Sequence, residues 1–499
     1  MRSCGTLLHI SSLPGEYGIG VFGKDAYSFV DFLKASGQSM WQILPLGITG
    51  YGDSPYQSFS SFAGNPYFID PEGLYKEGLA TKDELESQKI KADKVDYGRL
   101  YKERYAFLDL AFSRFNKDEP DYAEFCVKNA WWLDSFALFM TLKELAGSKG
   151  ISDWDREYKI KDKALLEQVE RIHGDRIDFW KINQYHFFKE WKSLREYANS
   201  NGVRVIGDIP IYVAADSADV WENPELFMVD AELEPKLMAG CPPDAFNSDG
   251  QLWGNPIYDW EAMRLDGYSW WKKRLAMTAK LYDLVRIDHF RGFCAYYTIE
   301  AGEKTAKQGK WIKGPGSEFF DEVKASLGSS EIIAEDLGFI DEPVRKLLSE
   351  CGFPGMKILE FGFDGDSGNE YLPHNYVKNS FAYTGTHDNE TFMSFYLKSD
   401  AKTKRYIRDY FNIDNSKDVC YGAVRTLFSS CADNVVIPLQ DYIGIADDGR
   451  MNTPSVVGGN WVWRATRSDF NDKLAERIYE LAALYGRAHT PVKGTNFYE

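Results

Sequence analysis

Three acids in this sequence stand directly after runs of apolar, β-branched residues. Asp288, Glu335 and Asp388 each follow such a run, and Asp388 is preceded by a histidine. Continuous apolar runs are typical of buried parallel strands, and in a parallel barrel the carboxyl ends of all strands meet at one mouth. Two carboxyl groups facing each other at such a mouth can act as nucleophile and proton donor when a glycosidic bond is broken.

The neighbours of these acids favour different protonation states. Arg286 lies two residues before Asp288 and points to the same side of its strand, so its charge favours an ionised Asp288, as a nucleophile requires. Glu335 would have to keep a proton at neutral pH to act as an acid, which requires burial and nearby negative charge. A single acid at a strand end is more often half of a structural ion pair, but three such ends favour one shared site.

Eight apolar runs bounded by Gly, Pro or Asp predict the strands that would position these acids. Between most of them lie helical patterns, at 24–35, 124–146, 180–200 and about 470–487. Alternating strands and helices indicate a parallel sheet, and eight strands predict an α/β fold of the (β/α)8 TIM-barrel type. The predicted strands are 5–10, 40–46, 203–209, 283–288, 331–335, 356–361, 380–386 and 433–438.

The spacing of the predicted strands is uneven. We expect residues 1–499 to form a single catalytic barrel, with the long segment between strands two and three as an insertion. Within it, residues 50–200 carry helical patterns and charged stretches, which predict a mostly helical subdomain mounted at the mouth. Residues 240–258 are punctuated by Gly and Pro and predict a mouth loop that acts as a lid.

Composition excludes several classes of partner. The net charge of −17 argues against nucleic acid and against an anionic membrane surface, and no apolar run reaches the length of about 18 residues that a membrane-spanning helix needs. Seven scattered cysteines without a Cys-x-x-Cys pair do not resemble a disulfide framework or a zinc site. A very short apolar run at the N-terminus does not resemble a signal peptide, so we expect a cytoplasmic protein.

A glycine-rich motif at Gly18, Gly20 and Gly23 matches the G-x-G-x-x-G pattern of dinucleotide-binding folds. The surrounding sequence does not fit that fold. The motif is separated from the preceding strand by residues 11–17, and the next strand ends without an acid that could hold a ribose hydroxyl. We therefore interpret the motif as a tight loop that leads into the first barrel helix.

The strand-end residues resemble those of the α-amylase superfamily, whose barrel enzymes carry motifs after strands three, four, five and seven. The corresponding residues here are Asp208, Arg286 with Asp288, Glu335, and His387 with Asp388. The likeness narrows to the 4-α-glucanotransferases of glycoside hydrolase family 77, also called amylomaltases or disproportionating enzymes. Supporting stretches are 11–14, 51–58, 64–67, 207–213, 242–244, 250–256, 285–292, 334–338, 386–389 and 459–464.

This resemblance implies a retaining transfer reaction. The sequence carries no evident calcium-binding signature, so we do not expect the calcium of the wider superfamily or another cofactor. Asp288 would be the nucleophile, Glu335 the acid and base, and Asp388 the acid that stabilises the transition state. The substrates would be α-1,4-glucans, with glucose or a maltooligosaccharide as the acceptor at its 4-hydroxyl, and glucose would be released. The protein would be a monomer or a small homo-oligomer.

The resemblance also implies residues that bind the sugar. Arg286 and His387 would flank the ring at the cleavage point. Asp208 is followed by Ile-Pro-Ile-Tyr-Val instead of the segment with a histidine that amylases carry, so we expect it to be structural and not catalytic. The remaining binding residues would be Asp53, Tyr56, Gln57, Asp244, Phe246, Trp253 and Asn460.

Three other functions stay open at the level of sequence. A plain α-glucan hydrolase would use the same three acids, and only its products from maltotriose would differ. A non-catalytic glucan-binding protein would not need both Asp288 and Glu335. A metal-dependent hydrolase could use Asp288, His289, His387 and Asp388, although no metal-ligand motif such as His-Glu-x-x-His is present.

Overall fold

The computed structural model describes residues 2–50, 52–243, 248–338 and 340–489. Eight parallel strands form one sheet in the order β10-β11-β12-β1-β2-β3-β6-β9, which winds around the centre of the molecule. Each predicted strand corresponds to one of them. Their bounds are β1 Ser3–Leu7, β2 Met40–Gln42, β3 Arg204–Ile209, β6 Leu284–Ile287, β9 Glu331–Ala334, β10 Gly355–Ile358, β11 Ser380–Tyr383 and β12 Asn434–Pro438.

The two ends of this sheet, β9 and β10, meet and bring the barrel close to closure. The Ala334 N–H donates to the Pro354 carbonyl at 3.0 Å, and the Met356 N–H donates to the Asp336 carboxylate at 2.6 Å. An added Cβ on Gly355 would lie 2.3 Å from that carboxylate, so only glycine leaves room for the contact. The predicted (β/α)8 barrel is thus confirmed, with a side chain bridging its seam.

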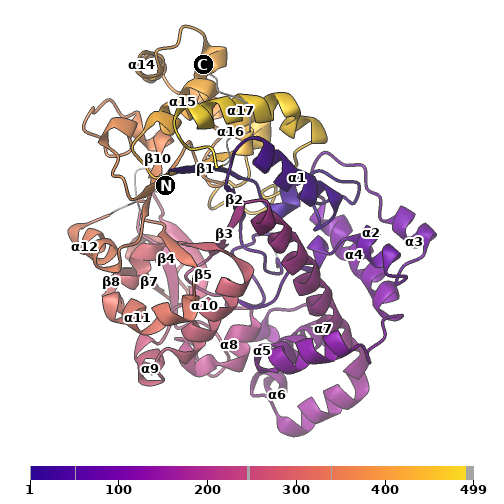
Figure 1. Ribbon diagram of the computed structural model, residues 1–499. Helices are drawn as coiled ribbons and strands as arrows, with labels where there is room; N and C mark the ends of the chain where they lie inside the picture. The colour runs from indigo at the N-terminus through magenta and orange to yellow at the C-terminus, as the bar shows by residue number, and fades with distance from the viewer. Residues whose placement is uncertain (1, 51, 244–247, 339, 490–499) are drawn as a thin grey trace.

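Helices cover the outside of the barrel (Figure 1). The first, α1, spans Lys24–Ala35, as predicted, and buries Ala26, Phe29, Val30 and Leu33 on one face. Gly37, with φ of 67°, follows its end. Further helices outside the insertion are α8 Ala218–Glu222, α9 Trp260–Leu265, α10 Ser269–Leu281, α11 Gly316–Val323, α12 Glu342–Cys351, α13 Phe392–Lys398, α14 Ala401–Phe411, α15 Val419–Ser429, α16 Leu439–Ile443 and α17 Asp472–Leu484.

The described residues between β2 and β3 form six α-helices, which occupy one flank of the molecule in Figure 1. Helix α7 is 38 residues long and contains non-helical φ and ψ angles at His173. Its second half contains the predicted helix 180–200 and packs against β3 and α10. Trp191 Nε1 donates to the carbonyl of Leu281, the last residue of α10, at 3.1 Å. The six helices are α2 Pro71–Lys76, α3 Lys82–Ser87, α4 Tyr97–Phe112, α5 Pro120–Leu145, α6 Arg156–Lys159 and α7 Lys163–Ser200.

A second sheet, which the sequence did not predict, is antiparallel and has the order β5-β4-β7-β8. Residues 240–258, expected to form a mouth loop, contribute β5 and the end of β4 to it. The register pairs Gly240 of β4 with Tyr297 of β7, and Tyr297 with Trp311 of β8. The bounds are β4 Leu237–Cys241, β5 Gln251–Pro256, β7 Ala295–Glu300 and β8 Lys310–Lys313.

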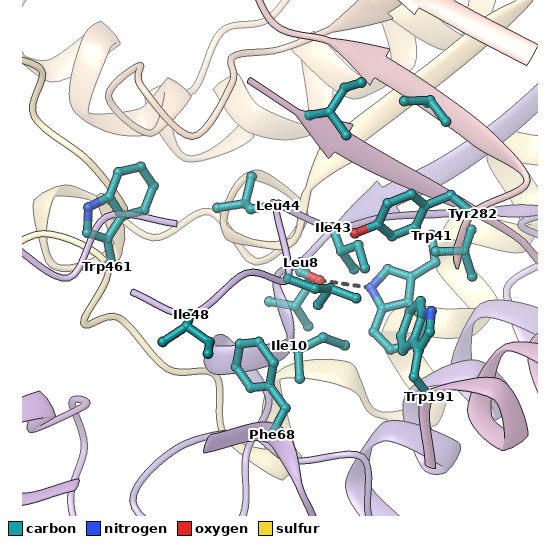
Figure 2. Packing of buried hydrophobic residues seen from close by; sticks show 14 of the residues in the cluster. Leu8, Ile10, Trp41, Ile43, Leu44, Ile48, Phe68, Trp191, Tyr282 and Trp461 are labelled. Atoms are coloured by element: carbon teal, nitrogen blue, oxygen red, sulfur yellow. Dashed lines mark hydrogen bonds between the residues drawn. The ribbon is translucent and has the colours of Figure 1, made fainter. Parts of the chain in front are cut away.

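The main core lies between the barrel strands and the surrounding helices (Figure 2). Trp41 of β2 is fully buried there, and its Nε1 donates to the Leu8 carbonyl at 2.8 Å, while Trp191 of α7 packs nearby. Alternate side chains of the same strands fill the barrel interior. The interior set is Leu7, Met40, Ile206, Leu284, Ile333, Met356, Ile358, Phe381, Tyr383 and Val436.

In the part of the chain that the structure describes, every helix is too short or too polar to cross a membrane.

Candidate active site

Strand register brings the predicted acids to one end of the barrel. Strand β3 pairs with β6, and β6 pairs with β9, so Asp208, Asp288 and Glu335 lie at the carboxyl ends of three neighbouring strands. In this register Asp208 lies opposite Arg286. Asp388 follows β11 across the mouth. Strands β6 and β9 end directly before Asp288 and Glu335, Asp208 is still within β3, and Asp388 lies in the loop after β11.

Arg286 connects two of the four acids. Its Nη1 donates to both carboxylate oxygens of Asp208 at 2.8 and 2.7 Å, and its Nη2 lies 2.9 Å from Asp288 Oδ1. The Arg286 and Asp208 side chains are 4% and 0% exposed, whereas that of Asp288 is 28% exposed. The predicted contact between Arg286 and Asp288 is therefore present. Asp208 is enclosed, which fits a role in fixing Arg286.

Two backbone donors fix the Glu335 carboxyl group. The His289 N–H donates to Glu335 Oε2 at 2.7 Å, and the Leu337 N–H donates to Oε1 at 2.8 Å. His289 has φ of 53° and ψ of 48°, a left-handed conformation that is strained for a residue with a side chain. This conformation occurs directly after Asp288 and turns the backbone toward Glu335. The two carboxyl groups are thus linked through one peptide unit.

The site favours the uptake of a proton. Burial raises the pKa of Glu335, and the nearby Asp388 adds to the rise, while Arg286 and the two backbone donors oppose it. Burial also raises the pKa of Asp288, with Arg286 opposing and the neighbouring carboxylates adding to the rise. The charge of a single guanidinium is shared by Asp208, Asp288 and Glu335, so the carboxyl pair holds a proton more tightly than isolated carboxyl groups would.

Asp388 is held in place by a residue that the sequence did not identify. Asn452 Nδ2 donates to Asp388 Oδ1 at 2.6 Å, and the Asn452 N–H donates to the His387 carbonyl at 3.1 Å. Arg450 Nη2 donates to the Asp388 carbonyl at 3.2 Å. The Asp388 side chain remains 44% exposed, so it can still meet a ligand. Asn452 is 64 positions from Asp388 and belongs to no spacing pattern that sequence reasoning could have used.

Three aromatic rings form one wall of the mouth. The rings of Tyr56 and His387 stack with centroids 5.2 Å apart, and Trp461 lies 5.9 and 5.8 Å from them. The Tyr56 hydroxyl donates to Asp208 at 2.7 Å. Burial lowers the pKa of His387, which keeps its imidazole neutral near pH 7. Trp461 was missed as a site residue, although the stretch 459–464 that contains it was noted.

Gln57 and Trp253 also reach the site. Gln57 Nε2 donates to Asn255 Oδ1 at 2.9 Å and lies 3.4 Å from the Trp253 carbonyl. The Trp253 ring meets His289 edge-on, with centroids 4.8 Å apart and planes at 85°. Trp253 therefore adjoins the segment that follows Asp288, and Gln57 lies next to Trp253.

Two other predicted binding residues, Asp53 and Asn460, contact a small pocket and a loop beside Trp461. Asp53, with φ of 59°, lines a small pocket beside Tyr97 and Trp461, and burial raises its pKa. The Asn460 amide donates to the Thr453 and Val456 carbonyls and accepts from the Thr453 N–H, so it braces the loop that precedes Trp461. Asp244 and Phe246 lie outside the described residues.

A metal site was one of the open alternatives. Across residues 2–50, 52–243, 248–338 and 340–489, His, Cys, Asp and Glu side chains form no group of three or more arranged to hold a metal ion. The proposed set of Asp288, His289, His387 and Asp388 is thus not such a cluster.

Comparisons with known proteins agree with this geometry. The profile of a family described as 4-alpha-glucanotransferase matches residues 8–469. The 4-alpha-glucanotransferase of Clostridium butyricum is 47% identical over 485 residues, covering 96% of this chain and 100% of the relative. That of Thermus thermophilus is 41% identical over 493 residues, covering 96% and 98%.

Solved structures show the same likeness. The amylomaltase from Streptococcus agalactiae, in complex with acarbose, superimposes with a TM-score of 0.95 at 41% identity, covering 98% of this chain and 100% of that one. Amylomaltase from Corynebacterium glutamicum gives a TM-score of 0.76 at 18% identity, covering 98% and 75%, and shares the fold. Profile, sequence and structure thus agree over nearly the whole length, and the chain belongs to the 4-alpha-glucanotransferase family.

Proposed function

We propose that this protein transfers segments of α-1,4-glucans from a donor chain to the 4-hydroxyl of an acceptor sugar, with retention at the anomeric carbon. The observation that carries the proposal is the linkage of Arg286, Asp288 and Glu335 at the barrel mouth, with Asp388 partly open beside them. The names of the family relatives support the same reaction. The acarbose bound by the Streptococcus agalactiae amylomaltase supports a sugar-type ligand.

In the first step Glu335 gives its proton to the glycosidic oxygen, and Asp288 attacks the anomeric carbon. The bond from that carbon to the oxygen breaks, and the departing sugar leaves with a free 4-hydroxyl group. A covalent ester then connects the glucan segment to Asp288. Burial raises the pKa of both carboxyl groups, so the pair holds a proton. Because Arg286 contacts Asp288 directly, the ionised form is favoured at Asp288 and the proton at Glu335.

In the second step the acceptor completes the exchange. Its 4-hydroxyl gives a proton to Glu335, which is now a carboxylate, and its oxygen attacks the anomeric carbon. The ester bond to Asp288 breaks, and the new glycosidic bond has the original configuration because two inversions cancel. Glu335 ends the cycle protonated, as it began.

Asp388 and His387 act on the sugar itself in this proposal. The Asp388 oxygen that Asn452 does not hold can accept hydrogen bonds from sugar hydroxyls, and these bonds strengthen as the ring flattens toward an oxocarbenium ion. The neutral His387, stacked on Tyr56, can donate to a hydroxyl from the same wall. Both contacts favour the transition state over the ground state, which accelerates the reaction.

Transfer has to compete with water for the intermediate. A well-positioned acceptor can reach an effective molarity of about 10⁵ M, which exceeds the concentration of water. We propose that Trp253 and the segment 240–258 hold the acceptor, with Phe246 as an additional contact. In this proposal the acceptor is glucose or a maltooligosaccharide.

We also propose a cytoplasmic location, supported by the scattered cysteines.

Incubation with maltotriose separates transfer from hydrolysis. We expect a ladder of longer maltooligosaccharides together with glucose, measured by chromatography. Products no longer than maltotriose would instead favour the α-glucan hydrolase, which uses the same acids. A protein that releases no product would favour the glucan-binding alternative.

A maltosyl fluoride donor separates the roles of the two carboxyl groups, because fluoride leaves without a proton from the enzyme. We expect Glu335→Gln to lose about 10²–10⁴-fold of its activity on maltotriose but still to release fluoride in a first-turnover burst, after which the intermediate accumulates because the amide cannot take the acceptor's proton. Asp288→Asn should be inactive on both donors, since it lacks the nucleophile. The same loss of fluoride cleavage in both variants would contradict the assignment of Glu335 as the proton donor.

A further inference from the structure

We propose that Trp311 is a second contact site for α-1,4-glucan chains, outside the catalytic mouth. The inference rests on the proposed function, since it assigns to Trp311 a further stretch of the same polymeric substrate. Its basis is the position of Trp311 on the edge strand of the antiparallel sheet, its exposed ring, and its connection to the segment that follows Asp288.

The first argument is exposure on an edge strand. All four residues of β8 are exposed, and the Trp311 side chain retains 40% of its accessible surface. Its neighbour across the sheet, Tyr297, is buried and meets the indole edge-on at 5.3 Å. Indole is among the most apolar of side chains, and leaving it in water forfeits the burial free energy that packing would supply.

The second argument is that Trp311 is held rigidly. The guanidinium carbon of Arg291 lies 3.8 Å from the indole centroid, so it covers one face of the ring. Arg291 is itself 5% exposed and lies 3.8 Å from the Asp341 carboxylate. The exposed part of Trp311 is therefore its opposite face and outer edge. A fixed ring with one free face can bind a ligand at low cost in conformational entropy.

The third argument is continuity with the active site. Arg291 belongs to the short helical turn Phe290–Phe293, which begins two residues after Asp288. The Phe290 N–H donates to the Glu335 carbonyl at 3.1 Å, and the Gly314 N–H, just after β8, donates to the Cys294 carbonyl at 2.8 Å. The Arg291 side chain thus connects Trp311 to the segment that positions Asp288 and Glu335.

The chemistry of this surface matches a glucan chain. The flat face of an indole fits the apolar face of a pyranose ring, and its N–H can donate to a sugar hydroxyl. Lys313, two residues after Trp311 on β8, points to the same side of the strand and adds an exposed donor. A single platform without a pocket binds weakly, so it contributes when the catalytic mouth already holds another part of the same chain.

Native gel electrophoresis with glycogen in the gel tests the proposal. We expect the wild-type protein to be retarded and Trp311→Ala to be retarded less. We further expect the KM for long amylose to rise about three- to tenfold in Trp311→Ala, as the loss of one aromatic contact implies. Turnover of maltotriose should be retained, because so short a chain is held at the catalytic mouth. Trp311→Phe should recover part of the affinity.

Trp131→Ala is the matched control. Trp131 is 43% exposed and lies on α5, so it shares the exposure of Trp311 but not its connection to Asp288. We expect it to bind glycogen and amylose as the wild type does. Equal retardation of Trp311→Ala and wild type, or an equal loss in both variants, would overturn the proposal. So would a loss of maltotriose turnover in Trp311→Ala, which indicates damage to the mouth.

The reaction with maltotriose separates this proposal from the proposed function. The maltotriose ladder of the wild-type protein tests the proposed function independently. Retardation that depends on Trp311 in a protein that makes no ladder would refute the transfer reaction and leave the contact site standing.

Discussion

At the scale of single residues, the site depends on hydrogen bonds and ion pairs that fix the orientation of its side chains. Asp208 and Asp288 share one guanidinium, and Glu335 accepts two backbone N–H groups. Each acid is therefore oriented before any sugar arrives. Such preorganisation is how an enzyme avoids reorganising its charges during the reaction.

Asn452 provides the most direct test of this preorganisation. Removing its amide in Asn452→Ala leaves Asp388 Oδ1 without its donor, and a hydrogen bond to a charged group contributes about 1.5–3 kcal/mol. We expect kcat/KM for maltotriose to fall about 10- to 100-fold, with the loss mainly in kcat, because Asp388 acts on the transition state. Steady-state kinetics measure both constants.

Asn460→Ala serves as the comparison for that variant. Asn460 lies in the same loop, but its amide hydrogen bonds join only Thr453 and Val456. We expect Asn460→Ala to change KM more than kcat. A kcat loss of the same size in both variants would mean that Asn452 acts only by holding the loop, and the positioning of Asp388 would then be refuted.

At the scale of secondary-structure elements, the barrel was predictable because its strands are short apolar runs with polar ends. All eight strands were found, but several predictions ran too long, such as 380–386 for β11 at Ser380–Tyr383. The excess residues form the loops that carry the site. The antiparallel sheet was missed because β8 reads Lys-Trp-Ile-Lys, without an apolar run, and its partners are distant in sequence. Asn452 and Trp461 were also missed because the site residues that they contact are distant in sequence.

The seam between β9 and β10 makes stability depend on pH. Burial raises the pKa of Asp336 to about 7, against an ordinary value of 3.8, while its carboxyl group accepts the Met356 N–H. Between these two values the folded protein binds the proton and the unfolded chain does not. This contribution is therefore most favourable below about pH 4 and is lost as the pH rises through about 7.

Asp336→Asn keeps the acceptor oxygen and removes the titration. We expect its free energy of unfolding to decline less than that of the wild type between pH 4 and 7, as measured by urea denaturation. Glu370→Gln is the control of opposite sign, because hydrogen bonds from Arg345 lower the pKa of Glu370 to about 2. Its loss of stability should be constant above pH 5. Parallel pH profiles for Asp336→Asn and wild type would contradict the prediction.

At the scale of the whole molecule, the helical segment between β2 and β3 and the barrel share one core. A single cluster of buried residues includes Phe136 and Phe139 of α5, Trp180 of α7, and Trp41 and Val435 of the barrel. Helix α7 extends from the outer helices to the barrel wall, and within it only His173 has non-helical φ and ψ angles. Residues 50–200 therefore form a subdomain only by their position in the chain, and we infer that they do not fold as a separate unit.

This inference predicts cooperative unfolding. Phe139→Ala removes a fully buried ring from α5, far along the chain from the catalytic acids, and should cost about 3–5 kcal/mol. If the helices and the barrel unfold together, the urea midpoint must shift equally whether unfolding is followed by far-UV circular dichroism or by the loss of maltotriose turnover. If the midpoint for maltotriose turnover stays at the wild-type value while the far-UV signal is lost at a lower urea concentration, the inserted helices fold on their own. In that case their contacts with the barrel would be an interface between domains, and the mouth would keep its geometry without them.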